Sequence, residues 1–333
     1  MAHDLVGRSF LKEQDFTVLE WSYLLDLAQR LKLEHVIGMK RARLNGSNLA
    51  LTFAKDFPCT RCAFEVAAHH QGAHVTYLDP EGSPLGRAES IKDTARVLSR
   101  MYDGIAYRGS SHADVELLAR YADVPVWNAL SDTWQPTQSL ADMLTMREAT
   151  GKADHDISFA YCGDARSSVA NSLLVAGAML GMDVRMVAPE TLWNPSTVVS
   201  AARDIAADTG AQITHTADVA AGVAGVDIVY TDAWVPTGEP VSTWGSRIAL
   251  LTPYQVNHQL LERTGNPDVK FMHCLPALHN RESTLGEELH AVHRLTALEV
   301  TEEVFESTHS VVFDQAENRM HTIEAVLVAT LGC

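Results

Sequence analysis

The sequence predicts an α/β protein made of two doubly wound parallel-sheet domains. Short apolar runs of strand length alternate with segments whose apolar residues recur at helical spacing, which is typical of a parallel sheet covered by helices. With 333 residues, of which 46% are hydrophobic and 20% charged, the chain is long enough for two globular domains. Polar residues also follow several of the predicted strands, and ligands of parallel sheets bind beyond the carboxyl ends of strands.

The first set of alternating segments begins with an amphipathic helix and ends before residue 150. Its clearest strand is the apolar run Asn-Leu-Ala-Leu-Thr-Phe at 48–53. Ser90, with Asp93 three residues later, has the pattern of a helix N-cap. We expect strands at 48–53, 74–78, 103–107 and 124–127, and helices at 18–35, 60–70, 90–101, 113–121 and 137–148.

A second alternating set follows the polar stretch 151–155, which has no apolar period and is the expected linker. We expect strands at 157–161, 183–187, 212–215, 226–230 and 269–272, and helices at 169–180, 197–208, 219–223 and 319–331. The predicted domains therefore comprise residues 1–150 and residues 151–318.

Composition excludes several classes of partner. A net charge of −16 argues against nucleic acid or an anionic membrane as the main partner, although a local basic cluster can still bind a small anion. The five cysteines are scattered and odd in number, so no disulfide framework is expected. No apolar stretch reaches membrane-spanning length and the N-terminus does not resemble a signal peptide, which predicts a cytoplasmic protein.

No metal or other cofactor is predicted. The polar stretch 279–294 contains His279, His290 and His293 among acidic residues. Their spacing fits no ligand set well, so this stretch is expected to be a solvated surface.

The segment Lys55–Glu65 is the first candidate for a binding site, because it joins the strand ending at Phe53 to a helix. Unpaired N–H groups at a helix N-terminus, together with the helix dipole, favour an anion. We place Thr60 as the N-cap, with positive charge added by Lys55 and Arg61. Taken alone, this segment is equally consistent with an ordinary strand-to-helix turn.

Polar groups follow other predicted strands as well, which a packing role alone does not explain. They are Arg108, Gln135–Gln138, Asp164–Asn171, Asp232 and His273–Pro276. Because parallel strands end at one edge of a sheet, these groups are expected to gather into a binding site.

Ordered motifs along nearly the whole chain resemble those of the ornithine carbamoyltransferase family. They are Glu89–Leu98, Tyr107–Gly109, Pro136–Gln138, Gly163–Arg166, Asp232–Trp234, His273–Pro276 and Phe313–His321. The resemblance implies a carbamoyl-phosphate domain, formed by 1–150 and a returning C-terminal helix at 319–333, and an ornithine domain at 151–318. It also implies a homotrimer, or a multiple of one, with small-molecule substrates and sites shared between subunits.

The same resemblance implies that an amine attacks the carbamoyl carbon and that phosphate leaves. It assigns catalytic roles to Arg108, Cys274 and Arg319. It assigns substrate contacts to Thr60, Arg61, Gln135, Gln138, Ser168, Asp232, Thr237 and Leu275. Among these, Asp232 would bind the α-amino group of the acceptor, and Cys274 would contact the attacking amine.

The sequence departs from the family pattern where phosphate is expected to bind. The family's Ser-Thr-Arg is replaced by Phe57, Pro58 and Cys59. A charge-assisted contact with phosphate is worth about 1.5–3 kcal/mol, and proline also lacks a backbone N–H. Further departures are Gln135 for a histidine, Pro84 and Ala88 for a glutamine and a lysine, Ser168 for an asparagine, and Pro236-Thr237 for Ser-Met.

Three functions follow from this combination. We favour a carbamoyltransferase-like transferase of the EC 2.1.3 type, acting on an ornithine-like amino acid with an altered donor, acceptor or both. The alternatives are an ordinary ornithine carbamoyltransferase that makes citrulline, and a non-catalytic binding or regulatory protein on the same fold.

Cys59 and Cys62 have the spacing of a redox pair across the start of a predicted helix. An incidental spacing and a nucleophilic Cys59 acting alone are the other interpretations.

Overall fold

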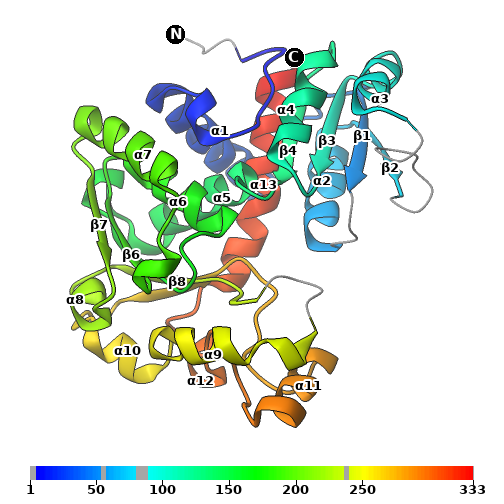
Figure 1. Cartoon of the computed structure of the whole chain (residues 1–333). Coiled ribbons are helices and arrows are strands. Elements are labelled where there is room, and N and C mark those ends of the chain that lie inside the picture. Colours follow the sequence, from blue (N-terminus) through cyan, green and yellow to red (C-terminus); the bar gives the residue numbers. More distant parts are fainter. Residues whose placement is uncertain (1–4, 54–57, 80–88, 236–239, 333) are drawn as a thin grey trace. The chain divides into compact units, whose positions relative to one another are not determined.

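The computed structural model describes residues 5–53, 58–79, 89–235 and 240–332 (Figure 1). Contacts between Cα atoms divide the chain into two units. Unit 1 comprises Met1–Leu144 and Glu317–Cys333, and unit 2 comprises Thr145–Ala316. Among the described residues, no helix is both long and apolar enough to cross a membrane.

Unit 1 contains a four-stranded parallel sheet in the order β2-β1-β3-β4 (Figure 1). The strands are β1 (Asn48–Phe53), β2 (His74–Leu78), β3 (Gly104–Arg108) and β4 (Val126–Leu130). The chain proceeds outwards from β1 to β2 in one direction and from β3 to β4 in the other. The reversal makes the junction of β1 and β3 a topological switch point, where doubly wound sheets bind ligands. Phe53 pairs with Arg108 at this junction.

The helices of the first half are α1 (Val18–Val36), α2 (Pro58–His70), α3 (Ile91–Leu98), α4 (His112–Tyr121) and α5 (Pro136–Thr150). Thr17 and Glu20 form a capping box at the start of α1. The predicted N-cap of α3 is confirmed, because the Ser90 hydroxyl accepts a hydrogen bond from the backbone N–H of Asp93. α5 extends in sequence from unit 1 into unit 2.

Unit 2 contains a five-stranded parallel sheet in the order β7-β6-β5-β8-β9. Its strands are β5 (Ser158–Cys162), β6 (Asp183–Val187), β7 (Gln212–Thr216), β8 (Ile228–Thr231) and β9 (Lys270–His273). Here the direction of strand addition reverses between β5 and β8, which is the second switch point. β8 and β9 are neighbours, and Thr231 pairs with His273 at their carboxyl ends.

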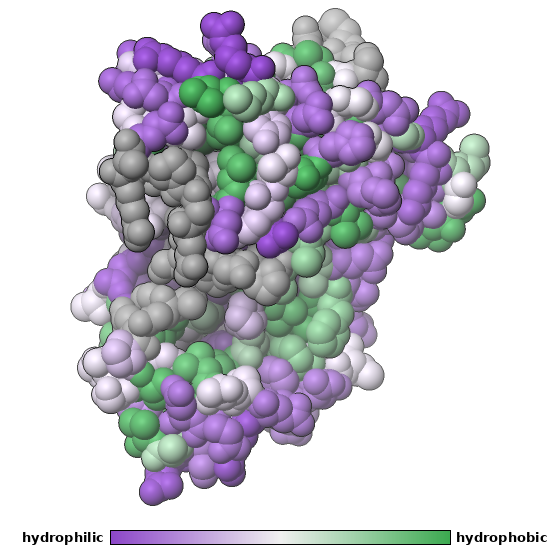
Figure 2. Space-filling view, turned by 90° about the vertical axis from the view of Figure 1, so that its right-hand side faces the viewer, coloured by the Kyte–Doolittle hydropathy of each residue, from purple (hydrophilic) through white to green (hydrophobic). Residues whose placement is uncertain are grey.

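The remaining helices are α6 (Ser168–Met179), α7 (Ser196–Thr209), α8 (Val219–Val223), α9 (Gly245–Leu251), α10 (His258–Arg263), α11 (Thr284–His293), α12 (Glu302–Phe305) and α13 (Val312–Leu331). α6 and the inner strands are almost wholly buried, as expected where helices cover a parallel sheet. Hydrophilic residues cover much of the face seen in Figure 2, with apolar residues interspersed among them.

The predicted fold class, two parallel-sheet α/β domains, is confirmed. Several local predictions differ from the structure, among them the following. α2 begins at Pro58, so Thr60 lies inside its first turn and is not the N-cap; the fixed φ of proline suits the first helical position. α13 begins at Val312, earlier than the predicted 319. The stretch 279–294 is mostly exposed, as expected of a solvated surface, although it includes α11, whose Leu289 is fully buried.

Candidate active site

Arg108 and Thr60 meet at the switch point of unit 1. Arg108 is the last residue of β3, and Thr60 lies in the first turn of α2, the helix that follows β1. The Arg108 Nη1 group donates a hydrogen bond to Thr60 Oγ1 over 2.7 Å. Both residues are buried, with 7% and 1% of their surfaces exposed. A buried guanidinium requires polar partners, so the Thr60 hydroxyl helps to fix the position of this charge.

Arg61, the next residue of α2, has partners of its own. Its Nε group donates to Glu65 Oε1 over 2.8 Å, one helical turn away. Its guanidinium also lies over the Tyr77 ring, 3.7 Å from the centroid. The role of Arg61 in substrate binding therefore stays a prediction. Cys59 is an exposed free thiol in the same turn, whereas Phe57 and the side chain of Pro58 lie outside the described part.

Gln138 lies in the first turn of α5 and is almost fully buried, with 2% of its surface exposed. Its Nε2 group donates to Asp142 Oδ1 over 2.7 Å, and its Oε1 has no hydrogen-bond partner among the described residues. A buried amide oxygen without a donor costs about 1–3 kcal/mol, which a ligand N–H can recover. Gln135, immediately before α5, is also buried.

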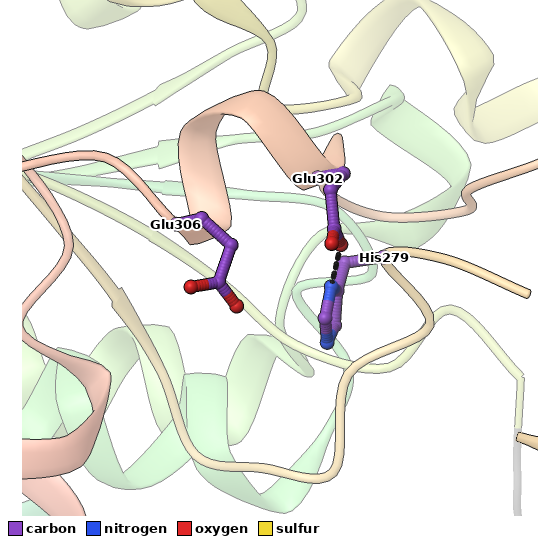
Figure 3. A group of neighbouring side chains, drawn as sticks. All are labelled: His279, Glu302 and Glu306. Atoms are coloured by element: carbon purple, nitrogen blue, oxygen red, sulfur yellow. Dashed lines mark hydrogen bonds and ion pairs between the residues drawn. The ribbon is translucent and has the colours of Figure 1, made fainter. Parts of the chain in front are cut away.

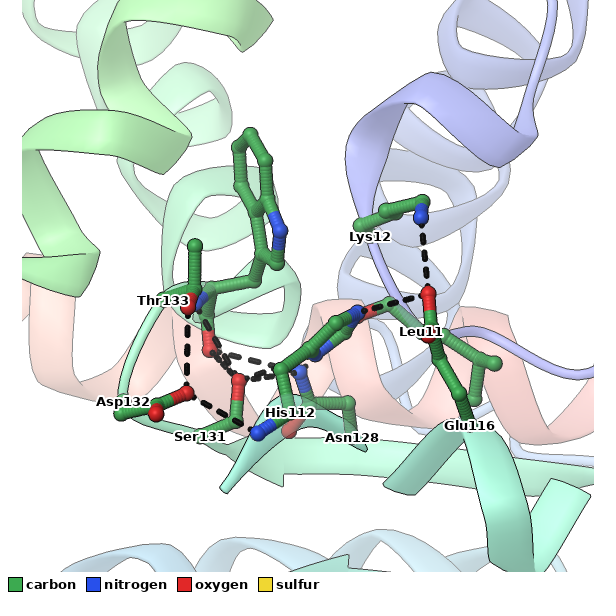
Figure 4. A network of polar contacts seen from close by, with 9 residues as sticks. Leu11, Lys12, His112, Glu116, Asn128, Ser131, Asp132 and Thr133 are labelled. Carbon is green, nitrogen blue, oxygen red and sulfur yellow. Dashed lines mark hydrogen bonds and ion pairs between the residues drawn. The ribbon is translucent and has the colours of Figure 1, made fainter. Parts of the chain in front are cut away.

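A polar network ties the loop before Gln135 to β4 and α4 (Figure 4). Ser131 Oγ accepts hydrogen bonds from Asn128 Nδ2 and from the backbone N–H of Trp134. His112 Nδ1 lies 3.0 Å from the same hydroxyl oxygen, and its Nε2 faces Glu116 at 3.5 Å. Burial lowers the pKa of His112 despite the nearby carboxylate. The sequence predicted none of these contacts.

Asp232 and Cys274 meet at the carboxyl ends of β8 and β9 in unit 2. Because Thr231 pairs with His273, the residues that follow them emerge side by side. The Cys274 thiol donates to Asp232 Oδ1 over 3.0 Å. The predicted acceptor carboxylate and the predicted catalytic thiol thus form one hydrogen-bonded pair, both partly accessible to solvent.

Buried polar groups hold the loop that carries Cys274. The backbone N–H of His273 donates to Gln315 Oε1 over 3.0 Å, and His273 Nδ1 accepts from the backbone N–H of Leu275 over 2.9 Å. Glu299 Oε1 lies 3.4 Å from His273 Nε2 and accepts from the backbone N–H of Leu278. Leu275 has a φ of 54°, a left-handed conformation that costs about 1–2 kcal/mol and that these contacts support.

Sequence reasoning missed Glu299 and Gln315 as positioning groups. Gln315 falls within the Phe313–His321 motif, so its presence was visible although its role was not. Glu299 carries no sequence signal, because its partner His273 comes from a distant strand.

The Gly163–Arg166 motif follows β5, the strand that pairs with β8. Asp164 forms ion pairs with Arg166 and Arg247, each at 2.9 Å. Burial opposes ionisation of Asp164, but hydrogen bonds from Arg166 and the two cationic neighbours lower its pKa. Burial also raises the pKa of Tyr161 well above its usual value, and the charge of Asp232 adds to the effect.

The remaining predicted residues are placed as follows. Ser168 is the first residue of α6 and is half-buried, and Arg319 is a buried residue of α13. Thr237, like Lys55, Pro84, Ala88 and Pro236, lies outside the described residues. The structure therefore joins Arg108 to Thr60 in unit 1, and Cys274 to Asp232 in unit 2.

These features define a two-domain α/β enzyme in which each parallel sheet carries a polar site at its own switch point. Two family models match the chain: "Aspartate/ornithine carbamoyltransferase, carbamoyl-P binding domain" over residues 8–148, and "Aspartate/ornithine carbamoyltransferase, Asp/Orn binding domain" over residues 155–330. The chain belongs to the aspartate/ornithine carbamoyltransferase family and is a transferase of the EC 2.1.3 class. The resemblance read from its motifs is confirmed.

Solved structures agree with this assignment. Ornithine carbamoyltransferase from Pyrococcus furiosus is 39% identical, with 99% of each chain covered and a TM-score of 0.91. The enzyme from Gloeobacter violaceus is 34% identical, covering 98% of this chain and 99% of that one, with a TM-score of 0.82. Anabolic ornithine carbamoyltransferase from Campylobacter jejuni is 30% identical, covering 96% and 97%, with a TM-score of 0.85.

Proposed function

We propose that this transferase moves a carbamoyl or related group to the amine of an ornithine-like amino acid, with a donor, an acceptor or both that differ from those of ordinary ornithine carbamoyltransferases. The observation that carries the proposal is the buried hydrogen bond of Arg108 with Thr60, a residue that the sequence Phe57-Pro58-Cys59 immediately precedes. The group suited to a carbonyl oxygen is retained, whereas the residues expected to hold phosphate are replaced.

On the donor side, Arg108 and Thr60 supply a fixed positive charge and a hydroxyl. Fixed donors of this kind stabilise the negative charge that develops on a carbonyl oxygen during acyl transfer, often the largest catalytic term. The buried Oε1 of Gln138 is an acceptor for the N–H groups of a carbamoyl function. We propose that the donor binds to residues 1–150 and 319–333, where Arg319 completes its contacts.

On the acceptor side, the Asp232 carboxylate is suited to an α-ammonium group. The Cys274 thiol is oriented by its hydrogen bond to Asp232, and we propose that the attacking amine approaches this sulfur. The backbone carbonyl of Leu275 would accept from the same amine. We propose that residues 151–318 bind the acceptor.

The altered specificity rests on the charge at the start of α2. Pro58 provides no N–H, Cys59 is neutral as a thiol, and Arg61 already has Glu65 and the Tyr77 ring as partners. A donor whose leaving group carries less negative charge than phosphate suits this arrangement better than carbamoyl phosphate does.

Ordinary ornithine carbamoylation is the second candidate. Relatives solved as ornithine carbamoyltransferases favour it, one of them 39% identical with 99% of this chain covered. So does the retention of both hydrogen-bonded pairs.

A citrulline assay with carbamoyl phosphate and ornithine, followed by a screen of donors and acceptors, separates the two candidates. We expect little citrulline and clear turnover with another pair. A matched variant with Phe57→Ser, Pro58→Thr and Cys59→Arg should bind carbamoyl phosphate at least about tenfold more tightly, since one charged contact is worth that much. Rapid citrulline formation by the unaltered chain would favour the second candidate, and a silent screen would refute both.

We further propose a homotrimer, or a multiple of it, as the family resemblance implies. Sedimentation equilibrium should then give a mass that is a multiple of three chains of 36.4 kDa. A monomeric mass would refute this.

A further inference from the structure

We propose that His279, Glu302 and Glu306 form a binding site for a divalent first-row transition metal ion, with zinc as the expected occupant (Figure 3). All three residues belong to unit 2, and none of them is a side chain to which we assign a contact with the donor or the acceptor. The proposal goes beyond the transferase function and does not depend on it.

The three side chains converge from two segments. His279 lies between β9 and α11, Glu302 is the first residue of α12, and Glu306 follows the last residue of that helix. One ligand atom from each lies within 4.8 Å of the other two, and His279 Nδ1 already hydrogen-bonds Glu302 Oε2. In a tetrahedral zinc site with bonds of about 2.0–2.2 Å, ligand atoms are about 3.3–3.6 Å apart. Side-chain rotations of the two exposed glutamates can close the difference.

Contacts within the protein fix the orientation of the His279 imidazole independently of any ion. The His279 ring stacks on the Phe305 ring, with centroids 3.6 Å apart and planes inclined by 5°. Phe305 is buried in the core of unit 2, so it is a rigid support. An ordered ring offers its nitrogen with little loss of conformational entropy.

Charge also favours a cation at this place. Glu302 and Glu306 lie one helical turn apart, where like charges repel, and Glu303 adds a third carboxylate to the same short helix. A divalent ion would relieve this repulsion in a protein whose net charge is −16. One imidazole nitrogen with two carboxylate oxygens suits zinc and its first-row neighbours, whereas magnesium and calcium prefer oxygen ligands alone.

The site is placed to support the loop of Cys274. His279 follows Cys274 closely in the sequence, and the intervening Leu278 is bound to Glu299 through its backbone N–H. A metal ion would therefore join the end of this loop to α12. We assign it a structural role in holding the loop.

Calorimetric titration of the metal-free full-length chain with zinc chloride tests the proposal. Glu306→Gln is the decisive variant, because the His279–Glu302 hydrogen bond does not involve Glu306. Glu303→Gln is the matched control: it makes the same charge change at an exposed position of the same helix. We expect zinc affinity to fall at least about tenfold in Glu306→Gln and in His279→Gln, and to stay within about twofold in the control.

Cobalt substitution separates this site from the cysteines. Cobalt bound here should lack a thiolate charge-transfer band, because all its protein ligands are nitrogen and oxygen. The proposal is overturned if the unaltered chain binds no zinc, if Glu306→Gln binds zinc as tightly as the unaltered chain, or if Glu303→Gln weakens binding as much as Glu306→Gln. Circular dichroism of each variant verifies folding. These readouts involve no turnover, so their failure is distinct from failure of the proposed function.

Discussion

Replacing Thr60 by valine should slow group transfer markedly, because it removes the hydroxyl that accepts a hydrogen bond from the Arg108 guanidinium. Valine keeps the size and branching of threonine, so the packing of this residue, which is 1% exposed, changes little. The lost bond is charge-assisted and buried, at 2.7 Å, and bonds of that class are worth about 1.5–3 kcal/mol. If that energy stabilises the transition state, kcat/KM should fall by about 10- to 150-fold.

The assay is the initial rate with the donor–acceptor pair that the screen identifies, measured for Thr60→Val and Thr60→Ser. Thr60→Ser retains the hydroxyl and loses only a methyl group, so its kcat/KM should stay within about fivefold of that of the unaltered enzyme. Thermal unfolding of both variants controls for folding. The reasoning is refuted if Thr60→Val lowers kcat/KM by less than about twofold, or if Thr60→Ser lowers it as much as Thr60→Val does. Either result would mean that the hydroxyl does not orient Arg108.

Three further predictions address other groups. Cys274→Ala should lower kcat by about 10²-fold or more with little change in melting temperature, as for loss of a general base, and unchanged turnover would remove Cys274 from the mechanism. Iodoacetamide should alkylate the exposed Cys59 but not Cys162, whose pKa burial raises to about 12, and an anionic ligand should slow the reaction; an inert Cys59 would end both the redox and the nucleophile hypotheses. Arg166 helps to lower the pKa of Asp164 in the folded protein. The ionised Asp164 therefore stabilises the fold above its unfolded pKa of about 3.8, and this stabilisation is lost as the pH falls below that value. Urea titrations should therefore show the deficit of Asp164→Asn shrinking from about pH 4 downwards; a deficit that grows there would contradict the assignment.

The sheets could be predicted from the sequence because buried parallel strands are contiguous apolar runs. The strands at 48–53, 74–78 and 183–187 have the predicted bounds, and nothing but their own residues was needed to find them. The gathering of polar groups was also predictable in part. Asp232 and Cys274 each follow a strand, and parallel strands end at one edge of a sheet. Their hydrogen bond then follows from the adjacency of β8 and β9.

The contacts that sequence reasoning missed join segments with no local signal. The ion pair of Arg61 with Glu65 has ordinary helical spacing, but the stacking on Tyr77 depends on β2 lying beside β1. Helices α9–α12 have at most ten residues each, too few for a clear apolar period. His279 lies near other histidines in the sequence, whereas its partner Glu302 comes from a later segment.

The retained residues Arg108 and Thr60 and the replaced residues at the start of α2 should affect different kinetic constants. In the proposed mechanism Arg108 and Thr60 contact the group being transferred, so their contribution should grow as charge develops in the transition state. A contact between the start of α2 and the leaving group would form as soon as the donor binds. Such a contact stabilises the bound substrate and the transition state about equally. Replacing that contact raises KM for carbamoyl phosphate and affects kcat less, whereas disturbing Thr60 lowers kcat. Under the proposed function, the changed helix start should therefore alter which donor is accepted, while the residues suited to acyl transfer are retained.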